Sequence, residues 1–174
     1  MRLLAGAAVA DITPPVGVPM AGYASREKGA EGVDDPLYVK ALVLDDGRGR
    51  IGLVASDLIG VPRWLTDAVR ERAEREAGIP GDNLLVCASH THFGPSLADY
   101  PASTGAAPDE YRRALVDKFA AAVAEAASNL REAEAKFGRS ELSGLTYNRR
   151  PKGPDGKVVM AFEPPVPEGF EPGP

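Results

Sequence analysis

The two histidines of this 174-residue chain, His90 and His92, are by type and spacing the residues best suited to metal chemistry. They lie two positions apart, directly after the apolar segment 84–88 and before the Phe-Gly-Pro sequence at 93–95. In an extended segment, side chains two positions apart point to the same side, so both imidazoles can converge on one point. Imidazole nitrogen is a good zinc ligand, and a catalytic zinc usually has three protein ligands and one position for water. The spacing therefore predicts part of a zinc site, to which histidine contributes at most two ligands.

The alternative interpretation of the pair is a polar loop without metal, in which both imidazoles are hydrogen-bonded to backbone groups. Two other zinc families fit the sequence less well. The metallo-β-lactamase pattern His-x-His-x-Asp-His is broken, because Gly94 and Pro95 stand where the aspartate and the third histidine belong. Amidohydrolases with a TIM barrel need further histidines downstream, and the sequence contains none.

A predicted strand, helix and second strand position the two histidines. Residues 51–55 and 84–88 are short aliphatic runs typical of strands. Between them, residues 62–77 carry apolar side chains at helical spacing, and Gly78 and Pro80 follow as helix stop signals. Such a βαβ unit is normally right-handed with parallel strands. The histidines are therefore expected in the crevice beyond the carboxyl end of the second strand, where open α/β sheets bind ligands.

The remaining segments predict an α/β fold with a mixed β-sheet and flanking helices. The run 37–44 is expected to form a hairpin with 51–55 through the Asp- and Gly-containing turn between them. An apolar face over 108–133 is typical of a long helix. We also expect a first strand ending near Asp11 and Ile12 (with a short signal peptide as the alternative for 3–10), an ordered loop over 14–32, and two short strands around Leu142 and Thr146.

Proline content separates the end of the chain from the rest. Residues 163–174 are rich in proline and glycine, so they are not expected to form a helix or a central strand. We therefore expect one domain portion over residues 1–162 and an extension over residues 163–174.

Composition argues against several classes of partner. The chain has 20 lysine and arginine residues against 25 aspartate and glutamate, a formal charge of −5, so no nucleic-acid partner is expected. No apolar run approaches the roughly 18 to 20 residues that a membrane-spanning helix needs. The single cysteine, Cys87, cannot form an internal disulfide. We expect it to pack as a small apolar side chain inside a buried strand.

Five short motifs occur in the order seen in one enzyme family. They are Ala-Asp-Ile-Thr-Pro-Pro (10–15), Met-Ala-Gly-Tyr (20–23), Ala-Ser-Asp-Leu (55–58), Ser-His-Thr-His-Phe-Gly-Pro (89–95) and Tyr-Asn-Arg-Arg (147–150). Together they resemble the N-terminal part of the catalytic domain of neutral/alkaline non-lysosomal ceramidases. The His-Thr-His-x-Gly-Pro element is the most specific of them, and the resemblance spans nearly the whole chain.

The resemblance implies a zinc-dependent hydrolase of a linear amide bond, acting on ceramide or another N-acyl substrate. It implies that His90 is a zinc ligand and that His92 lies beside the metal as a substrate-facing or acid-base group. Gly22 matches a loop glycine that lines the substrate pocket, and Asn148 and Arg149 match a position whose arginine faces that pocket. A guanidinium could hold an anionic or hydroxyl-bearing substrate group. A surface role for the arginine stays open, because Arg150 is adjacent to it.

Asp57 follows the strand 51–55 and has two interpretations. The favoured one is a cap of the turn before the next helix. The other is a residue that orients a zinc ligand through a hydrogen bond.

The family pattern is incomplete in this chain. The resemblance implies that a second histidine, a glutamate and a tyrosine complete the zinc site downstream, and no residue here matches those positions. We therefore expect an N-terminal fragment that is inactive alone, and a non-catalytic binding or scaffold fragment of the same fold is the alternative. An incomplete sheet would also expose a strand edge, through which the chain could associate with itself.

Overall fold

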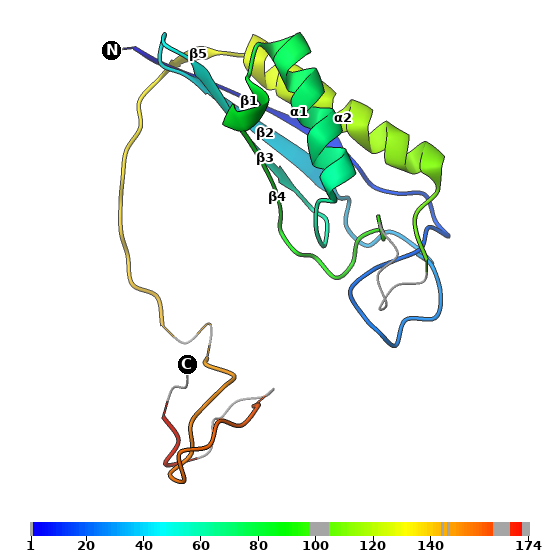
Figure 1. Cartoon of the computed structure of the whole chain (residues 1–174), viewed down its shortest axis with the longest axis vertical. Helices are drawn as coiled ribbons and strands as arrows, with labels where there is room; N and C mark the ends of the chain where they lie inside the picture. The colour runs from blue at the N-terminus through cyan, green and yellow to red at the C-terminus, as the bar shows by residue number, and fades with distance from the viewer. Residues whose placement is uncertain (1, 98–104, 144, 146, 162–167, 172–174) are drawn as a thin grey trace. The chain divides into compact units, whose positions relative to one another are not determined.

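The computed structural model describes residues 2–97, 105–143, 145, 147–161 and 168–171 (Figure 1). The chain divides into two units, Met1–Glu134 and Ala135–Pro174. All the helices and strands named below lie in the first unit. The predicted division after residue 162 stays a prediction, and residues 162–167 lie outside the described part of the chain.

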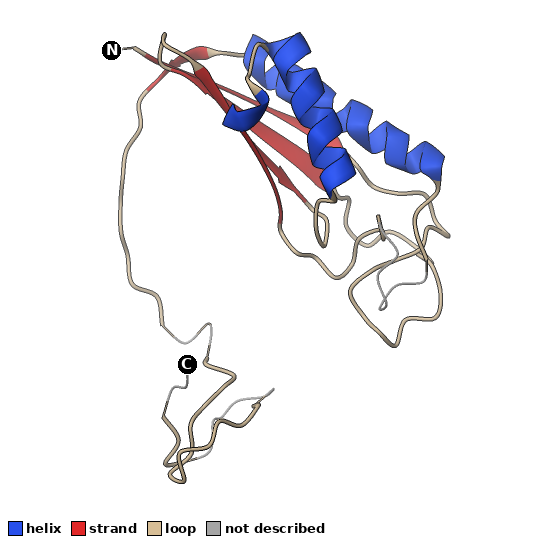
Figure 2. Ribbon diagram, viewed as in Figure 1, coloured by secondary structure: helices blue, strands red, loops and turns tan. Residues whose placement is uncertain are grey.

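A five-stranded sheet forms one layer of the first unit (Figure 2). Three of its strand pairs are antiparallel and one, between β3 and β4, is parallel, which confirms the predicted mixed α/β fold. The order across the sheet is β4-β3-β2-β1-β5. The strands are β1 (Leu3–Asp11), β2 (Tyr38–Asp45), β3 (Arg50–Ser56), β4 (Leu84–Ala88) and β5 (Arg131–Ala133).

The predicted hairpin is the β2–β3 pair. It closes at the pair Asp45 and Arg50, whose carboxylate and guanidinium are 2.9 Å apart. Within the turn, the Asp46 carboxylate accepts hydrogen bonds from the backbone N–H groups of Arg48 and Gly49. Side-chain acceptors of this kind replace strand partners where the chain reverses, which is why aspartate favours turns.

The first helix confirms the predicted βαβ unit. Helix α1 (Arg63–Ala77) links β3 to β4, which run parallel, and it ends at Gly78 with a left-handed φ of 64°. A short 3-10 turn, η1 (Gly81–Asn83), leads from it into β4. Glycine adopts this conformation without a Cβ penalty, so the helix stops at the position that the sequence predicts.

Helix α2 (Asp109–Ser128) is shorter than the predicted 108–133. Its end is decided by pairing with a distant strand, because Arg131–Ala133 form β5 beside Leu3–Ala5 of β1. Gly6 permits this close approach, since a Cβ there would lie 2.1 Å from the Ala126 carbonyl oxygen. The helical periodicity of the sequence therefore wrongly predicted helix for residues 129–133.

Both helices cover the same face of the sheet (Figures 1 and 2). The core lies between these two layers, and its largest fully buried side chains come from both of them. They include Phe119, Leu115, Leu65, Val69, Val39, Val43 and Val54. Burial of side chains of this size is the main favourable contribution to folding.

The opposite face of the sheet keeps apolar side chains exposed. Val9 and Leu85 are 57% and 56% exposed, and Ile51 and Leu53 are 45% and 39% exposed. Cys87 is also exposed, so its predicted burial is wrong. Successive side chains of a strand point to opposite faces of the sheet, and among the described residues helices cover only one face of β4. Cys87 lies on the other face.

The second unit has little regular structure in its described residues. Lys152 forms isolated bridges with Val158 and with Glu171. The predicted strand at Leu142 is absent from that part of the chain, and Thr146 lies outside the described residues. Among the helices that the structure describes, none is both long and apolar enough to cross a membrane.

Candidate functional site

The parallel strands β3 and β4 end side by side and carry the candidate site beyond their carboxyl ends. Ser56 is the last residue of β3 and Ala88 the last of β4, and these two residues are paired. The Ser89 N–H continues the ladder by donating to the Ser56 carbonyl at 2.9 Å. His90 therefore leaves the sheet where the sequence predicts, at the crevice formed by adjacent strand ends.

His90 has a fixed ring orientation. It is the only non-glycine residue with a positive φ among those the structure describes, at 63°. Its Nδ1 lies 2.7 Å from the Ile59 carbonyl oxygen in the loop after β3. A carbonyl only accepts hydrogen bonds, so the proton of a neutral His90 belongs on Nδ1, and Nε2 presents a lone pair. A hydrogen bond of this kind fixes the tautomer of a metal-ligating histidine.

The two imidazoles converge. The Nε2 atoms of His90 and His92 are 3.3 Å apart, and the ring planes are inclined by 75°. Two nitrogens at 2.0 to 2.1 Å from a tetrahedral zinc would be separated by about 3.3 to 3.4 Å. The predicted convergence therefore holds, although the backbone reason differs, because the positive φ of His90 is not extended geometry.

The Met20–Tyr23 segment packs directly on the histidine loop. The Ala21 N–H donates to the Gly94 carbonyl at 3.1 Å, and Met20 forms an isolated bridge with Pro95. Gly22 has a φ of 110°, and a Cβ on it would lie 2.6 Å from the Cβ of His92. The structure thus brings Gly22 to His92, and only glycine meets both requirements at position 22.

Tyr23 and Arg26 complete the surroundings of His92. The Tyr23 ring meets the His92 ring edge to face at a centroid distance of 5.2 Å, and it meets Phe93 in the same way at 5.6 Å. Arg26 donates from Nη1 to the carbonyl oxygens of Ala21 and His92, at 2.7 and 3.1 Å. Sequence reasoning missed Arg26, because a single arginine in a charged loop carries no signal of these contacts.

Asp57 does not cap α1. The helix begins after Pro62 without a side-chain cap. The Asp57 carboxylate instead accepts the Tyr38 N–H at 3.0 Å, lies 3.7 Å from the Lys40 ammonium, and has the Ser89 hydroxyl at 3.5 Å. The favoured interpretation of Asp57 is therefore wrong. Its carboxylate joins the start of β2 to the histidine loop.

A second group of contacts fixes the start of the long loop. Thr13 donates to the Asp11 carboxylate from its hydroxyl and its backbone N–H, and these bonds lower the pKa of Asp11. The partly buried Tyr111 hydroxyl of α2 donates to the Ile12 carbonyl, and burial raises the pKa of Tyr111. Helix α2 is therefore bonded to the start of the loop that contains Gly22 and Arg26.

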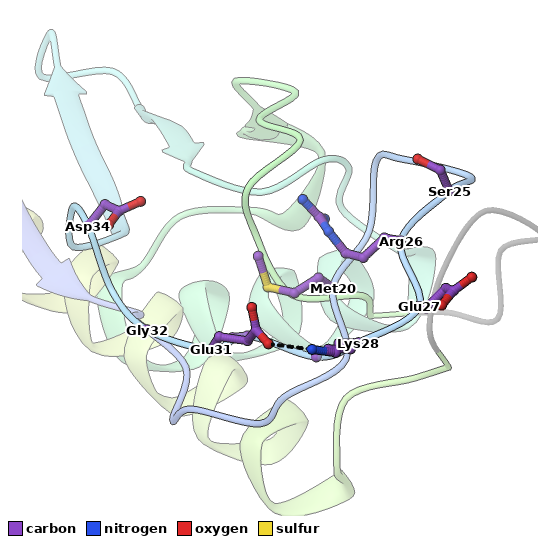
Figure 3. Close-up of a pocket in the computed structure, with 10 residues that line it drawn as sticks. Met20, Ser25, Arg26, Glu27, Lys28, Glu31, Gly32 and Asp34 are labelled. Carbon is purple, nitrogen blue, oxygen red and sulfur yellow. Dashed lines mark hydrogen bonds and ion pairs between the residues drawn. The ribbon is translucent and has the colours of Figure 1, made fainter.

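Two cavities lie along this loop. One of about 530 Å³ is lined mainly by polar residues of the loop, and Figure 3 shows its side chains. The other, of about 410 Å³, is lined partly by Phe93 and Thr91 of the histidine loop and by Met20, Val33 and Leu37. The histidine loop therefore borders a partly apolar cavity.

Asn148 and Arg149 belong to the second unit and are described with it alone. Both are exposed there. The Asn148 side chain accepts the Arg150 N–H at 2.7 Å, and the Arg149 carbonyl accepts the Ala161 N–H at 2.9 Å. Their substrate-facing roles stay predictions.

Among the described residues, no cysteine, aspartate, glutamate or further histidine joins the histidine pair as a possible metal ligand. Within the described residues, no group of three or more histidine, cysteine, aspartate or glutamate side chains is arranged to hold a metal ion. The two imidazole nitrogens fit zinc in type and separation, but they supply at most two of the three protein ligands that a catalytic zinc usually has.

Comparisons with known proteins agree on one family. Residues 3–153 match the family described as neutral/alkaline non-lysosomal ceramidase, N-terminal. The neutral ceramidase of Mycobacterium tuberculosis is 29% identical over 164 residues, which are 86% of this chain and 25% of that protein. Neutral ceramidase 3 of Arabidopsis thaliana is 31% identical over 150 residues, covering 81% of this chain and 20% of the relative. The chain thus spans about a quarter or less of the length of these relatives.

A solved structure shows the same fold. The crystal structure of neutral ceramidase from Pseudomonas aeruginosa superposes with a TM-score of 0.65 at 24% identity, over 76% of this chain and 22% of that one. At this level of identity the likeness supports the arrangement of strands and helices.

Proposed function

This chain belongs to the neutral/alkaline non-lysosomal ceramidase family, and from that membership we propose that it is part of a zinc-dependent hydrolase of linear amide bonds. The single observation that carries the proposal is the convergence of His90 and His92, whose Nε2 atoms are 3.3 Å apart beyond the end of β4. The substrate class we propose is ceramide or a related N-acyl compound, since the relatives named above are neutral ceramidases.

His90 would hold the zinc through Nε2. Its Nδ1 is engaged by the Ile59 carbonyl, so the lone pair lies on the nitrogen that faces His92, where it can accept a hydrogen bond from His92 Nε2 or bind a metal ion. A zinc ion bound there would lower the pKa of a bound water to about 7 and polarise the scissile carbonyl. Zinc binding would therefore give a chemical role to His90, whose ring is oriented by a backbone carbonyl at the end of a strand.

His92 would act beside the metal on substrate or on a proton. Its Nε2 lies within 3.3 Å of His90 and its ring is held from the side by Tyr23. A group placed so close to the reacting atoms can receive or deliver a proton at Nε2. Gly22 would line the substrate site beside His92, because a Cβ on Gly22 would lie 2.6 Å from the His92 Cβ. Asn148 and Arg149 are proposed to hold the substrate.

The remaining zinc ligands must come from other residues than those described. The chain spans about a quarter or less of its relatives' length, and its described residues bring no cysteine, aspartate, glutamate or further histidine to the two histidines as a metal ligand. We therefore propose that catalysis belongs to a protein in which this region is an N-terminal fragment, and that the isolated 174 residues bind zinc weakly and hydrolyse no amide.

The absence of a third donor from the described residues also favours a second candidate function. In this alternative the fold is kept as a non-catalytic binding or scaffold fragment without metal. Self-association is a further part of the proposal. Strand β4 has a strand neighbour on one side only among the described strands, and an unpaired strand edge is a template for another chain.

The two candidates are separated by metal content and hydrolysis. Zinc would be measured in the purified gene product that contains these residues, together with release of fatty acid from N-acylsphingosine. His90→Ala is compared with Lys28→Ala, which removes an exposed ion pair to Glu31 in the neighbouring loop. The hydrolase requires stoichiometric zinc and loss of both signals in the His90 variant alone. A folded protein without zinc or hydrolysis would support the scaffold, and activity that survives His90→Ala would refute the mechanism.

A further inference from the structure

We propose that Arg26 is a positioning residue that holds His92 in its place beside His90. The proposal rests on the proposed function, because it assigns a role within that same site. Arg26 lies in the loop 20–32, far from His92 in sequence, and its guanidinium joins the two loops that form the site. It matches none of the motifs that identify the chemistry.

The first set of contacts holds the backbone. Arg26 Nη1 donates to the Ala21 carbonyl at 2.7 Å and to the His92 carbonyl at 3.1 Å. One cation therefore links residues on either side of the close contact between Gly22 and His92. Hydrogen bonds in which the donor is charged are roughly twice as strong as neutral ones, so this link resists separation of the loops.

The second set of contacts holds the rings. The Arg26 guanidinium carbon lies 5.1 Å from the centroid of the Tyr23 ring and 5.7 Å from that of Phe93. Tyr23 in turn meets the His92 ring at 5.2 Å. Arg26 therefore fixes the backbone of His92 directly and its imidazole through Tyr23. A planar guanidinium can stack and donate at the same time, which an ammonium cannot.

The neighbouring cation of the loop has a different environment. Lys28 pairs with Glu31 at 3.1 Å on the exposed surface, and Figure 3 shows the Arg26 side chain extending away from that pair. The described contacts of Lys28 include none with the histidine loop. Lys28 is therefore a matched control that has the same charge and lies in the same loop.

A positioning role and a simple charge effect predict different results. A positive charge near the histidines repels a metal cation, so removing it would strengthen metal binding. Loss of a positioning contact instead displaces the His92 ring, which is proposed to lie beside the metal and not to hold it, so Zn²⁺ affinity through His90 does not change. Arg26→Lys separates the two effects further, because it keeps the charge and one donor but loses the stacking plane.

The experiment compares wild type, Arg26→Ala, Arg26→Lys and Lys28→Ala as the 174-residue chain. The His92 ring signals are recorded by ¹H–¹³C NMR without metal, and the dissociation constant for Zn²⁺ by calorimetric titration. We expect Arg26→Ala to shift the His92 signals and to leave the dissociation constant for Zn²⁺, which His90 would hold, unchanged. Arg26→Lys should give a smaller shift of these signals in the same direction, and Lys28→Ala should match wild type in both measurements.

Several outcomes would overturn the proposal. Tighter Zn²⁺ binding in Arg26→Ala would show that Arg26 acts on the site through its charge. Unchanged His92 signals in both Arg26 variants would show that Arg26 does not position His92. If Arg26→Ala does not fold, wild-type behaviour of Arg26→Lys in both measurements overturns it equally. If the wild-type chain binds no Zn²⁺, the proposed weak zinc binding of the isolated 174 residues fails. The metal-free His92 signals still decide the role of Arg26 in that case.

Discussion

Gly22 and His92 approach so closely that a methyl group on Gly22 would lie 2.6 Å from the His92 Cβ. This contact joins a loop that follows β1 to a loop that follows β4. It places the Met20–Tyr23 segment directly beside His92. Because the φ of Gly22 is 110°, the backbone itself also favours glycine.

Gly22→Ala is therefore expected to move His92 as well as to destabilise the fold. Gly17→Ala is the matched control, because Gly17 also has a positive φ, 91°, but nothing lies within 4 Å of a Cβ there. The control should cost about 1 to 3 kcal/mol through backbone strain alone. Gly22→Ala should cost more in urea unfolding and shift the His92 ring signals. Equal losses of unfolding free energy in the two variants would show that small shifts of neighbouring atoms relieve the clash with His92.

The Ile59 carbonyl is expected to hold neutral His90 in the Nδ1–H tautomer. The 2.7 Å contact allows only donation from Nδ1, so Nε2 should carry the lone pair. Nitrogen-15 NMR of the metal-free chain at neutral pH distinguishes a protonated from an unprotonated ring nitrogen. A His90 signal with the proton on Nε2 would leave that atom without a lone pair for zinc and would contradict the site.

The turn aspartate Asp45 should make stability depend on acid pH. The Gly47 N–H, followed by Arg50, holds the pKa of Asp45 below its ordinary value of 3.8 in the folded chain. The unfolded chain then binds more protons, so this contribution is present above pH 3.8 and is lost as pH falls through the folded pKa. Urea midpoints measured against pH should fall less steeply below pH 4 in Asp45→Asn than in wild type. Identical slopes in the two proteins would show that Asp45 does not contribute to the loss of stability in acid.

The exposed face and edge of β4 should promote self-association. Leu85 is 56% exposed on the edge strand and belongs to the uncovered apolar face. Leu85→Lys should lower the mass-average molecular weight measured by light scattering at high protein concentration, because charged residues on an edge oppose pairing. Leu142→Lys is the control, since Leu142 is 77% exposed in the second unit. A concentration-independent monomer in wild type would exclude the proposed association.

Several elements were predictable from the sequence because neighbouring residues decide them. Gly78 ends α1 at the predicted residue, and the Asp46 turn closes the β2–β3 hairpin. The position of the two histidines also follows locally, because they come directly after an aliphatic run that forms β4. Capping, turn chemistry and side-chain periodicity act over a few residues, and the sequence displays them directly.

Other features depend on residues far apart in the chain. The end of α2 is set by pairing of Arg131–Ala133 with β1, and Asp57 bonds to Tyr38 where a cap of the turn before α1 was expected. Arg26 contacts His92 across 66 positions. The sequence alone determined that a histidine pair stands at a strand end. The tertiary structure decided which residues hold that pair, because each of those contacts exists only after distant segments have packed together.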